Sequence, residues 1–403
     1  MVSAKEYLDS KHKEIIDLET MLTSHIAIAP EGEGDGESEK VNALEAWLKE
    51  KGFSDIERYE APDSRVSSGS RPSLVATIPG QDDSSRIWVI AHTDVVPVGD
   101  LKLWDSDPWK VIEKDGKLYG RGVEDDQQGL CSGVFAALYY LENNIKPAHT
   151  IKLLFAADEE NGSEYGVIWL LHEKKLFRKE DLILIPDGGD SQGQTIEVAE
   201  KNILWLQVKV LGKQTHGSMP DSGANACLAA CDLSLRIHNL EKYFDKRDNL
   251  FSPNYSTFQP TKRAKNVDSI NIIPGEDNLC FDCRILPCYS LAQVLEEVDK
   301  VCREVGKEHG VKISYETPQK SESPATPVSA PVAQKLAAAL KTAHGIDAEF
   351  IGIGGGTVGA ELRREGFNAV VWSTLDNMCH QPNEYCVIDN LIKDAITLIE
   401  YFK

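Results

Sequence analysis

The sequence predicts an α/β protein whose larger domain is a mostly parallel sheet with helices on both faces. Two observations predict this class. Apolar, β-branched runs alternate with segments of helical spacing, which is typical of strands joined by helices in a parallel sheet. Over residues 203–317 the pattern changes to strand–helix–strand–strand–helix–strand, which predicts an inserted ferredoxin-like α+β domain. A chain of 403 residues is long enough for both domains.

The first part of the chain supplies helices and strands in turn. Residues 3–25 and 39–52 have helical spacing, and 129–143 carries a long apolar helical face. Apolar runs at 73–78 and 87–91 predict strands. The second of these runs is apolar throughout, so we expect it to be buried on both faces of the sheet.

Polar side chains follow the run 87–91 directly, because His92 ends it and Asp94 stands two residues on. In open α/β sheets, ligands bind just beyond the carboxyl ends of the strands. A carboxylate near the second ring nitrogen of a histidine is a common way to orient a metal-binding imidazole. One such histidine more often only caps a core strand. The pattern repeats, however, after the apolar runs 151–157, 182–185 and 368–373, which lead to Asp158-Glu159-Glu160, Asp187 and His380.

The inserted domain has its own elements. We expect strands at 204–210, 268–273, 278–285 and 311–315, with helices at 224–240 and 291–309. The segment Pro318–Pro327 is rich in proline and serine and predicts the return linker. The larger domain is therefore split into 1–202 and 318–403, because His380 has to join His92, and the insertion covers 203–317.

Composition excludes several classes of protein. The net charge of −21 argues against nucleic acid or an anionic membrane as a partner, since both require basic patches. No apolar run is long enough to span a membrane. The first residues are polar, and the nine cysteines show no disulfide spacing. We therefore expect reduced thiols and a cytoplasmic location.

Five residues form a candidate ligand set: His92, Asp125, Glu160, Asp187 and His380. Imidazole and carboxylate suit zinc, and also cobalt or manganese. Five ligands are too many for one catalytic zinc but suffice for two divalent ions if one carboxylate bridges them. Glu159, next to a ligand, is the natural general base.

The order of these motifs resembles the co-catalytic di-zinc metallopeptidase and amidohydrolase family. This family includes aminoacylase, acetylornithine deacetylase, succinyl-diaminopimelate desuccinylase, carboxypeptidase G and the carnosine-type dipeptidases. The matching motifs cover nearly the whole chain: His92-Thr-Asp94, Gly120–Asp125, Asp158-Glu-Glu160, Asp187, Thr215–Pro220, Asn271–Pro274, Asp282-Cys-Arg284, Gly354–Thr357, and His380 with Glu384.

The resemblance implies a role for each residue. His92 and Asp187 would hold one metal, Glu160 and His380 the other, and Asp125 would bridge, while Asp94 would orient His92. His216 would reach the scissile carbonyl oxygen from the partner subunit of a homodimer, so the insertion would be a lid and dimerisation domain. Asn271, Arg284 and the loop with Gly355, Gly356 and Thr357 would receive the substrate carboxylate. The expected reaction is cleavage of an amide bond in a dipeptide or an N-acyl amino acid.

The sequence departs from this family at one place. Members commonly carry a lysine shortly after the bridging aspartate, whereas this chain has Asp126-Gln127-Gln128-Gly129. The departure makes the local charge more negative and affects the expected substrate, but not the expected metal site.

Two alternatives differ in class. Gly354–Gly359 fits the G-x-G-x-x-G fingerprint of a dinucleotide-binding protein, with Asp376 downstream as a ribose-binding acid. Only 44 residues follow Gly359, too few for a second mononucleotide-binding half. A non-catalytic homologue is the other alternative, and the presence of Glu159 argues against it.

Overall fold

The computed structural model describes residues 2–403 and divides into two compact units. Unit 1 is formed by the chain up to Val198 together with Thr326–Ile351 and Thr357–Lys403. Unit 2 is formed by Ala199–Ala325 and the short segment Gly352–Gly356. The predicted insertion, residues 203–317, lies within the long segment of unit 2.

Unit 1 is built on an eight-stranded sheet in the order β1-β2-β6-β3-β7-β16-β8-β15. The four central strands, β6, β3, β7 and β16, are parallel to one another. The flanking strands β1, β2 and β8 pair antiparallel, a detail that apolar runs alone do not specify. The bounds are β1 Asp55–Pro62, β2 Ser70–Ile78, β3 Asp82–His92, β6 His149–Ala156, β7 Leu182–Asp190, β8 Thr195–Glu200, β15 Glu349–Ile353 and β16 Ala369–Thr374.

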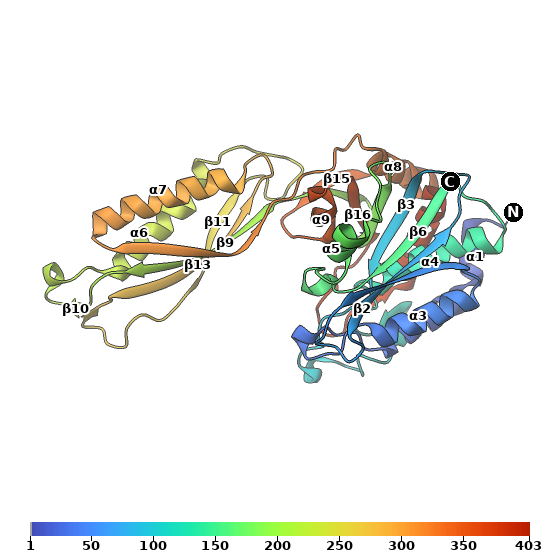
Figure 1. The fold of residues 1–403 in the computed structure, drawn as a ribbon, viewed down its shortest axis with the longest axis horizontal. Helices are drawn as coiled ribbons and strands as arrows, with labels where there is room; N and C mark the ends of the chain where they lie inside the picture. The colour runs from blue at the N-terminus through green and yellow to red at the C-terminus, as the bar shows by residue number, and fades with distance from the viewer. Residues whose placement is uncertain (1) are drawn as a thin grey trace. The chain divides into compact units, whose positions relative to one another are not determined.

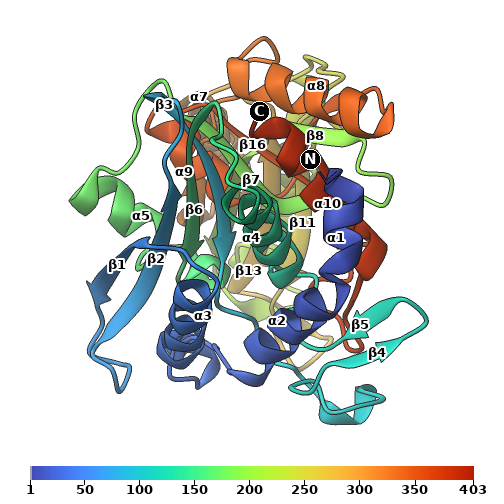
Figure 2. The same ribbon diagram turned by 90° about the vertical axis from the view of Figure 1, so that its right-hand side faces the viewer.

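Helices cover both faces of this sheet, so the predicted α/β class is confirmed (Figure 2). Helices α4, α8 and α10 pack on one face, and α5 and α9 pack on the other. The segment 3–25, expected as one helix, forms two helices that meet at Lys11. The bounds are α1 Ala4–Ser10, α2 His12–Ser24, α3 Ser38–Glu50, α4 Gln127–Glu142, α5 Val167–Trp169, α8 Pro331–His344, α9 Val358–Arg364 and α10 Ile388–Tyr401. Among residues 2–403, no helix combines the length and the apolar character needed to cross a bilayer.

A small three-stranded sheet joins two distant parts of unit 1. Its strands are β4 Ile112–Lys114, β5 Lys117–Tyr119 and β17 Tyr385–Val387. Strand β17 pairs antiparallel with β5, which places Tyr385 opposite Tyr119. The pairing brings the segment after β16 beside the segment before α4.

Unit 2 contains a four-stranded antiparallel sheet in the order β11-β13-β9-β14, the strand order of a ferredoxin-like unit. Helices α6 and α7 cover one face and enclose an apolar core (Figure 1). The bounds are β9 Asn202–Leu211, β11 Thr257–Arg263, β13 Glu276–Ile285, β14 Lys312–Ser321, α6 Ala226–His238 and α7 Leu291–His309, with a short ladder of β10 Thr215–His216 and β12 Ile272–Ile273.

The strand expected at 268–273 was assigned to the wrong segment. Only Ile272–Ile273 is extended there, and the second strand of the sheet is β11, Thr257–Arg263. Pro260 weakens the strand signal of this segment, because proline lacks the N–H that a central strand needs. The strand tolerates this residue because β11 is an edge strand with an irregular register between Pro260 and Lys262.

Candidate metal centre

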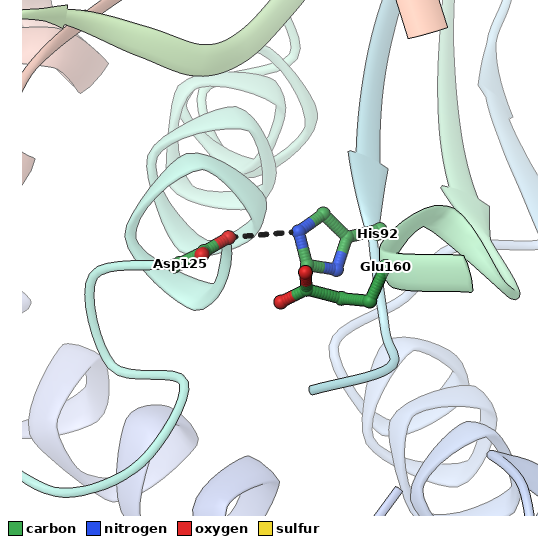
Figure 3. Close-up of side chains that lie close together, drawn as sticks. All are labelled: His92, Asp125 and Glu160. Atoms are coloured by element: carbon green, nitrogen blue, oxygen red, sulfur yellow. Dashed lines mark hydrogen bonds and ion pairs between the residues drawn. The ribbon is translucent and has the colours of Figure 1, made fainter. Parts of the chain in front are cut away.

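His92 stands at the end of β3 with both ring nitrogens engaged. Its Nδ1 lies 3.0 Å from the backbone oxygen of Asp94, so Nδ1 carries the proton and donates it. Its Nε2 lies 3.0 Å from Oδ1 of Asp125 (Figure 3) and 4.0 Å from Oδ2 of Asp187. A neutral imidazole with a fixed Nδ1–H presents Nε2 as a metal ligand.

Asp125 lies between the two histidines of the predicted set. While Oδ1 faces His92, Oδ2 lies 3.2 Å from Nε2 of His380. The same His380 nitrogen is 3.0 Å from Oε2 of Glu160. A carboxylate that offers one oxygen to each histidine has the placement required of a bridging ligand.

The chemistry of these donors fits divalent metal ions. One atom of each of His92, Asp125 and Glu160 lies within 4.8 Å of the others, and the same holds for His92, Glu159 and Asp187. Burial raises the pKa of Asp187 well above its usual value, and the charges of Glu159 and Asp125 add to the effect. Buried carboxylates with too little positive charge around them are stabilised by bound cations.

Asp94 holds Glu159 and Glu160 in place. It stands two residues after β3, which lies beside β6 in the sheet. Both glutamates follow β6 in a short turn, and their backbone N–H groups donate to the two oxygens of the Asp94 carboxylate, at 3.0 and 3.1 Å. The Asp94 carboxylate is 3.5 Å from Nδ1 of His92, farther than the backbone oxygen of the same residue. Asp94 therefore contacts His92 chiefly through its backbone, and its side chain fixes the acidic turn.

Burial raises the pKa of the Glu159 carboxyl to about 8. His92 opposes this shift, whereas the negative charges of Asp94 and Glu160 add to it. A carboxyl with a pKa in this range can exchange a proton near neutral pH, as a general base requires.

Two buried charged residues, Arg71 and Glu37, hold the acidic turn, and no local sequence pattern points to either of them. Arg71 pairs with Glu37, and both side chains are fully buried. Glu37 accepts the backbone N–H of Asp158 at 3.3 Å, and Nη1 of Arg71 lies 3.3 Å from Oδ1 of Asp158. In the sequence these residues are indistinguishable from surface charges.

The residues after Asp125 face the interior of unit 1. The carboxylate of Asp126 accepts the backbone N–H of His92 at 3.2 Å. Gln127 accepts a hydrogen bond from the Thr23 hydroxyl, and Gln128 donates to the backbone oxygen of Thr374 at 2.8 Å. The two glutamines therefore tie α4 to neighbouring elements.

The other predicted site residues belong mostly to unit 2. His216 pairs with Ile272 in the β10–β12 ladder, and Asn271 directly precedes β12, where its backbone oxygen accepts the Gly217 N–H. Arg284 donates to both carboxylate oxygens of Asp282, at 2.7 and 3.0 Å, and to the backbone oxygen of Gly354 at 2.7 Å.

The glycine-rich loop connects β15 to α9, where Thr357 caps the helix by accepting the Gly359 N–H at 3.0 Å. In the sheet, β8 lies between β15 and β16, the next strand along the chain. In a dinucleotide-binding βαβ unit the two strands would be neighbours, and here they are not.

The fold and the cluster of histidines and carboxylates define a metal-dependent hydrolase. The sequence model of peptidase family M20/M25/M40 matches residues 88–403, and the chain belongs to this family. The predicted family resemblance is thus confirmed, and the chain is an enzyme of the metal-dependent hydrolase class.

Two proteins of similar sequence agree with this family. The chain is 39% identical to an uncharacterized metallohydrolase of Methanocaldococcus jannaschii, over 97% of this chain and 99% of that protein. It is 24% identical to a succinyl-diaminopimelate desuccinylase of Wolbachia pipientis, over 96% and 92% of the two chains.

Solved structures share the fold. Aminopeptidase PepT of Bacillus cereus superposes with a TM-score of 0.78 at 18% identity, covering 97% of this chain and 98% of that one. Human carnosine dipeptidase 1 superposes with a TM-score of 0.71 at 16% identity, covering 99% and 97%.

Proposed function

We propose that the chain hydrolyses an amide bond in a small substrate with a free carboxylate, either a dipeptide or an N-acyl amino acid, and that it uses two divalent metal ions. The observation that carries this proposal is the position of Asp125, one oxygen of which faces His92 while the other faces His380. In this proposal His92 and Asp187 hold one ion, Glu160 and His380 hold the other, and Asp125 bridges them. Imidazole and carboxylate donors favour zinc, with cobalt or manganese as alternatives.

Each side chain has a defined task. Bound metal ions would supply a reactive water at neutral pH and polarise the scissile carbonyl group. Glu159 takes the proton from the attacking water and delivers it to the leaving nitrogen. Asp94 keeps Glu159 and Glu160 in place through their backbone N–H groups.

The substrate carboxylate would bind to Arg284, with Asn271 and the loop Gly355-Gly356-Thr357 as further contacts. A guanidinium group suits this role because it offers paired donors to a carboxylate. Asp282 already occupies one edge of this guanidinium, so a substrate would use the remaining N–H groups or displace Asp282.

We further propose that the enzyme is a homodimer joined through unit 2, in which His216 completes the site of the partner. The outward face of α6 supports this arrangement. Leu228 is 58% exposed and Leu235 is 63% exposed, with exposed Cys231 between them. An outward helical face normally carries charged residues, and an apolar one is suited to a second copy of the chain.

A cytoplasmic location is part of the proposal. All nine cysteines, Cys131 through Cys386, are free in the structure. Reduced thiols are typical of proteins that fold in a reducing compartment.

A substrate screen tests the proposed reaction. Metal-loaded protein is assayed against dipeptides, N-acetyl-amino acids and N-succinyl-amino acids, each with a free or an amidated carboxyl terminus. We expect hydrolysis of at least one free-acid class and much weaker hydrolysis of its amidated counterpart. Hydrolysis of none of these classes by protein of verified metal content would contradict the proposal.

A further inference from the structure

Two loops of unit 1 carry Asp125 and His380, and the small sheet brings them together. Loop A, residues 120–126, leads from β5 to α4, and loop B, residues 375–384, leads from β16 to β17. Because β17 pairs with β5, the last residue of loop B reaches the first residue of loop A, and Gly120 N–H donates to the backbone oxygen of Glu384 at 3.1 Å.

The side chain of Glu384 holds loop A. Its carboxylate is fully buried, and four donors of loop A converge on it. Oε2 accepts from Nη1 of Arg121 at 2.6 Å and from Gly122 N–H at 3.0 Å. Oε1 accepts from the N–H groups of Glu124 and Asp125, at 3.0 and 3.2 Å. The backbone that presents Asp125 is thus wrapped around a carboxylate of loop B.

The side chain of Glu124 does the reverse and holds loop B. Its carboxylate, also buried, accepts the backbone N–H of Asp376 at 2.8 Å and the backbone N–H of Met378. Met378 stands two residues before His380. Since the Glu124 N–H is itself bound to Glu384, the contacts form a closed cycle between the two loops.

We propose that Glu384 and Glu124 are paired positioning residues, each of which fixes the metal ligand carried by the other loop. Together they set the position of Asp125 relative to His380. Carboxylates are required because the groups that converge on them are all donors, and a glutamine would present its own N–H groups to them. That these positions govern metal binding rests on the proposed function, whereas the mutual bracing of the loops does not.

Hydrogen exchange of the metal-free protein tests the bracing. The variants are Glu384→Gln and Glu124→Gln, and Glu50→Gln, an exposed glutamate at the end of α3, is the matched control. Loss of hydrogen bonds to a charged acceptor should speed local exchange about 10- to 100-fold. Glu124→Gln should speed exchange in peptides spanning 374–381 while 119–127 stays protected. Glu384→Gln should act first on 119–127. The proposal is overturned if Glu124→Gln leaves exchange in loop B unchanged and Glu384→Gln leaves exchange in loop A unchanged.

Calorimetric titration of the same metal-free variants with Zn²⁺ tests the effect on the ligands. Loss of a residue that orients a metal ligand typically weakens affinity about 10- to 100-fold. Glu124→Gln should weaken only the binding step that involves His380, and Glu384→Gln should weaken both steps because Asp125 serves both ions. Faster exchange with unchanged Zn²⁺ affinity would reduce the two residues to a purely structural role and overturn the positioning claim.

The test stays decisive in two further cases. Glu384→Gln leaves buried Arg121 without its carboxylate partner, and this variant could fail to fold for that reason. Glu124→Gln then decides alone, because no cation pairs with Glu124 in the described contacts. If the wild-type chain binds one ion only, the two-metal function fails, while the exchange result still decides whether the loops brace each other.

Discussion

At the scale of single residues, Glu159 and Glu160 are adjacent in sequence but differ in their partners. Oε2 of Glu160 faces the His380 imidazole at 3.0 Å, whereas Glu159 lies with His92 and Asp187. Asp94 holds both backbones in the same way. Because the backbone support is shared, substitutions at the two positions should separate proton transfer from metal binding.

Glu159→Gln should lower kcat about 10²- to 10⁴-fold, the usual contribution of general acid–base assistance, while metal content stays close to that of the wild type. Glu160→Gln, the matched control, should instead weaken metal binding. Steady-state kinetics and elemental analysis of both variants check this. Retention of more than about a third of kcat in Glu159→Gln would place the base elsewhere.

Arg284→Ala should lower kcat/KM for free-acid substrates about 10- to 100-fold and leave amidated substrates nearly unchanged, because the lost hydrogen bonds involve a charged partner. Asp282→Asn is the control, since it keeps Arg284 but removes the carboxylate that occupies its guanidinium. Kinetics on matched free-acid and amidated substrates provide the readout. Equal losses on both would mean that Arg284 only supports the strand.

At the scale of elements, α4 packs closely against β7, the strand that carries the proposed metal ligand Asp187. A Cβ atom on Gly129, in the first turn of α4, would overlap Oδ1 of Asp126 and would lie 2.7 Å from both the backbone oxygen and Cγ of Pro186, which precedes Asp187. A Cβ atom on Gly133, one turn later, would meet side-chain atoms alone, a Val89 methyl group at 3.2 Å and a Leu153 methyl group at 3.7 Å. The helix can therefore reach the carboxyl end of β7 only with glycine at position 129.

Gly129→Ala should lower the free energy of unfolding by about 1–3 kcal/mol, the usual cost of overpacking, and weaken metal binding because α4 moves away from Asp187. Gly133→Ala, the matched control, should lower the free energy of unfolding less than Gly129→Ala does, because its Cβ atom meets side-chain atoms and no backbone. Denaturant unfolding and metal titration of both variants test this. Similar behaviour of the two variants would show that the contact with Pro186 is not limiting.

At the scale of the whole molecule, the metal count follows from the donor set. Protein purified with metal should approach two ions per chain, and chelation should lower the unfolding temperature. Binding contributes about 4 kcal/mol at a free metal concentration near 1,000 times Kd. Outside the proposed site, donor atoms of Asp232, Glu308 and His309 also lie within 4.8 Å of one another. His309→Ala should leave the count unchanged, because Arg236 already pairs with both carboxylates of this group. Saturation at one ion would contradict a bridging Asp125.

The proposed dimer gives a complementation experiment. Inactive His216→Ala chains are mixed with inactive Glu159→Gln chains under conditions of verified subunit exchange. About a quarter of the wild-type activity should return, since half of the dimers are mixed and each mixed dimer keeps one composite site. A lack of activity after exchange would mean that His216 does not act on the partner subunit.

Much of the fold could be predicted from apolar periodicity, because buried strands and amphipathic helices repeat at fixed intervals. The buried run that ends at His92 is one example, and α7, with its regular apolar face, is another. Strand β11 was missed because Pro260 is tolerated only at a sheet edge, and the position of a strand within a sheet is set by distant partners.

The sequence by itself determined the α/β class, the family and the candidate ligands, because these depend on local periodicity and on rare residue types at fixed positions. Only the tertiary structure decided what the remaining charged residues do. Glu384, Glu124, Glu37 and Arg71 have the same side-chain chemistry as residues on the surface of the protein. Their roles arise from burial and from hydrogen bonds to segments up to 263 residues away in the chain, which no local pattern encodes.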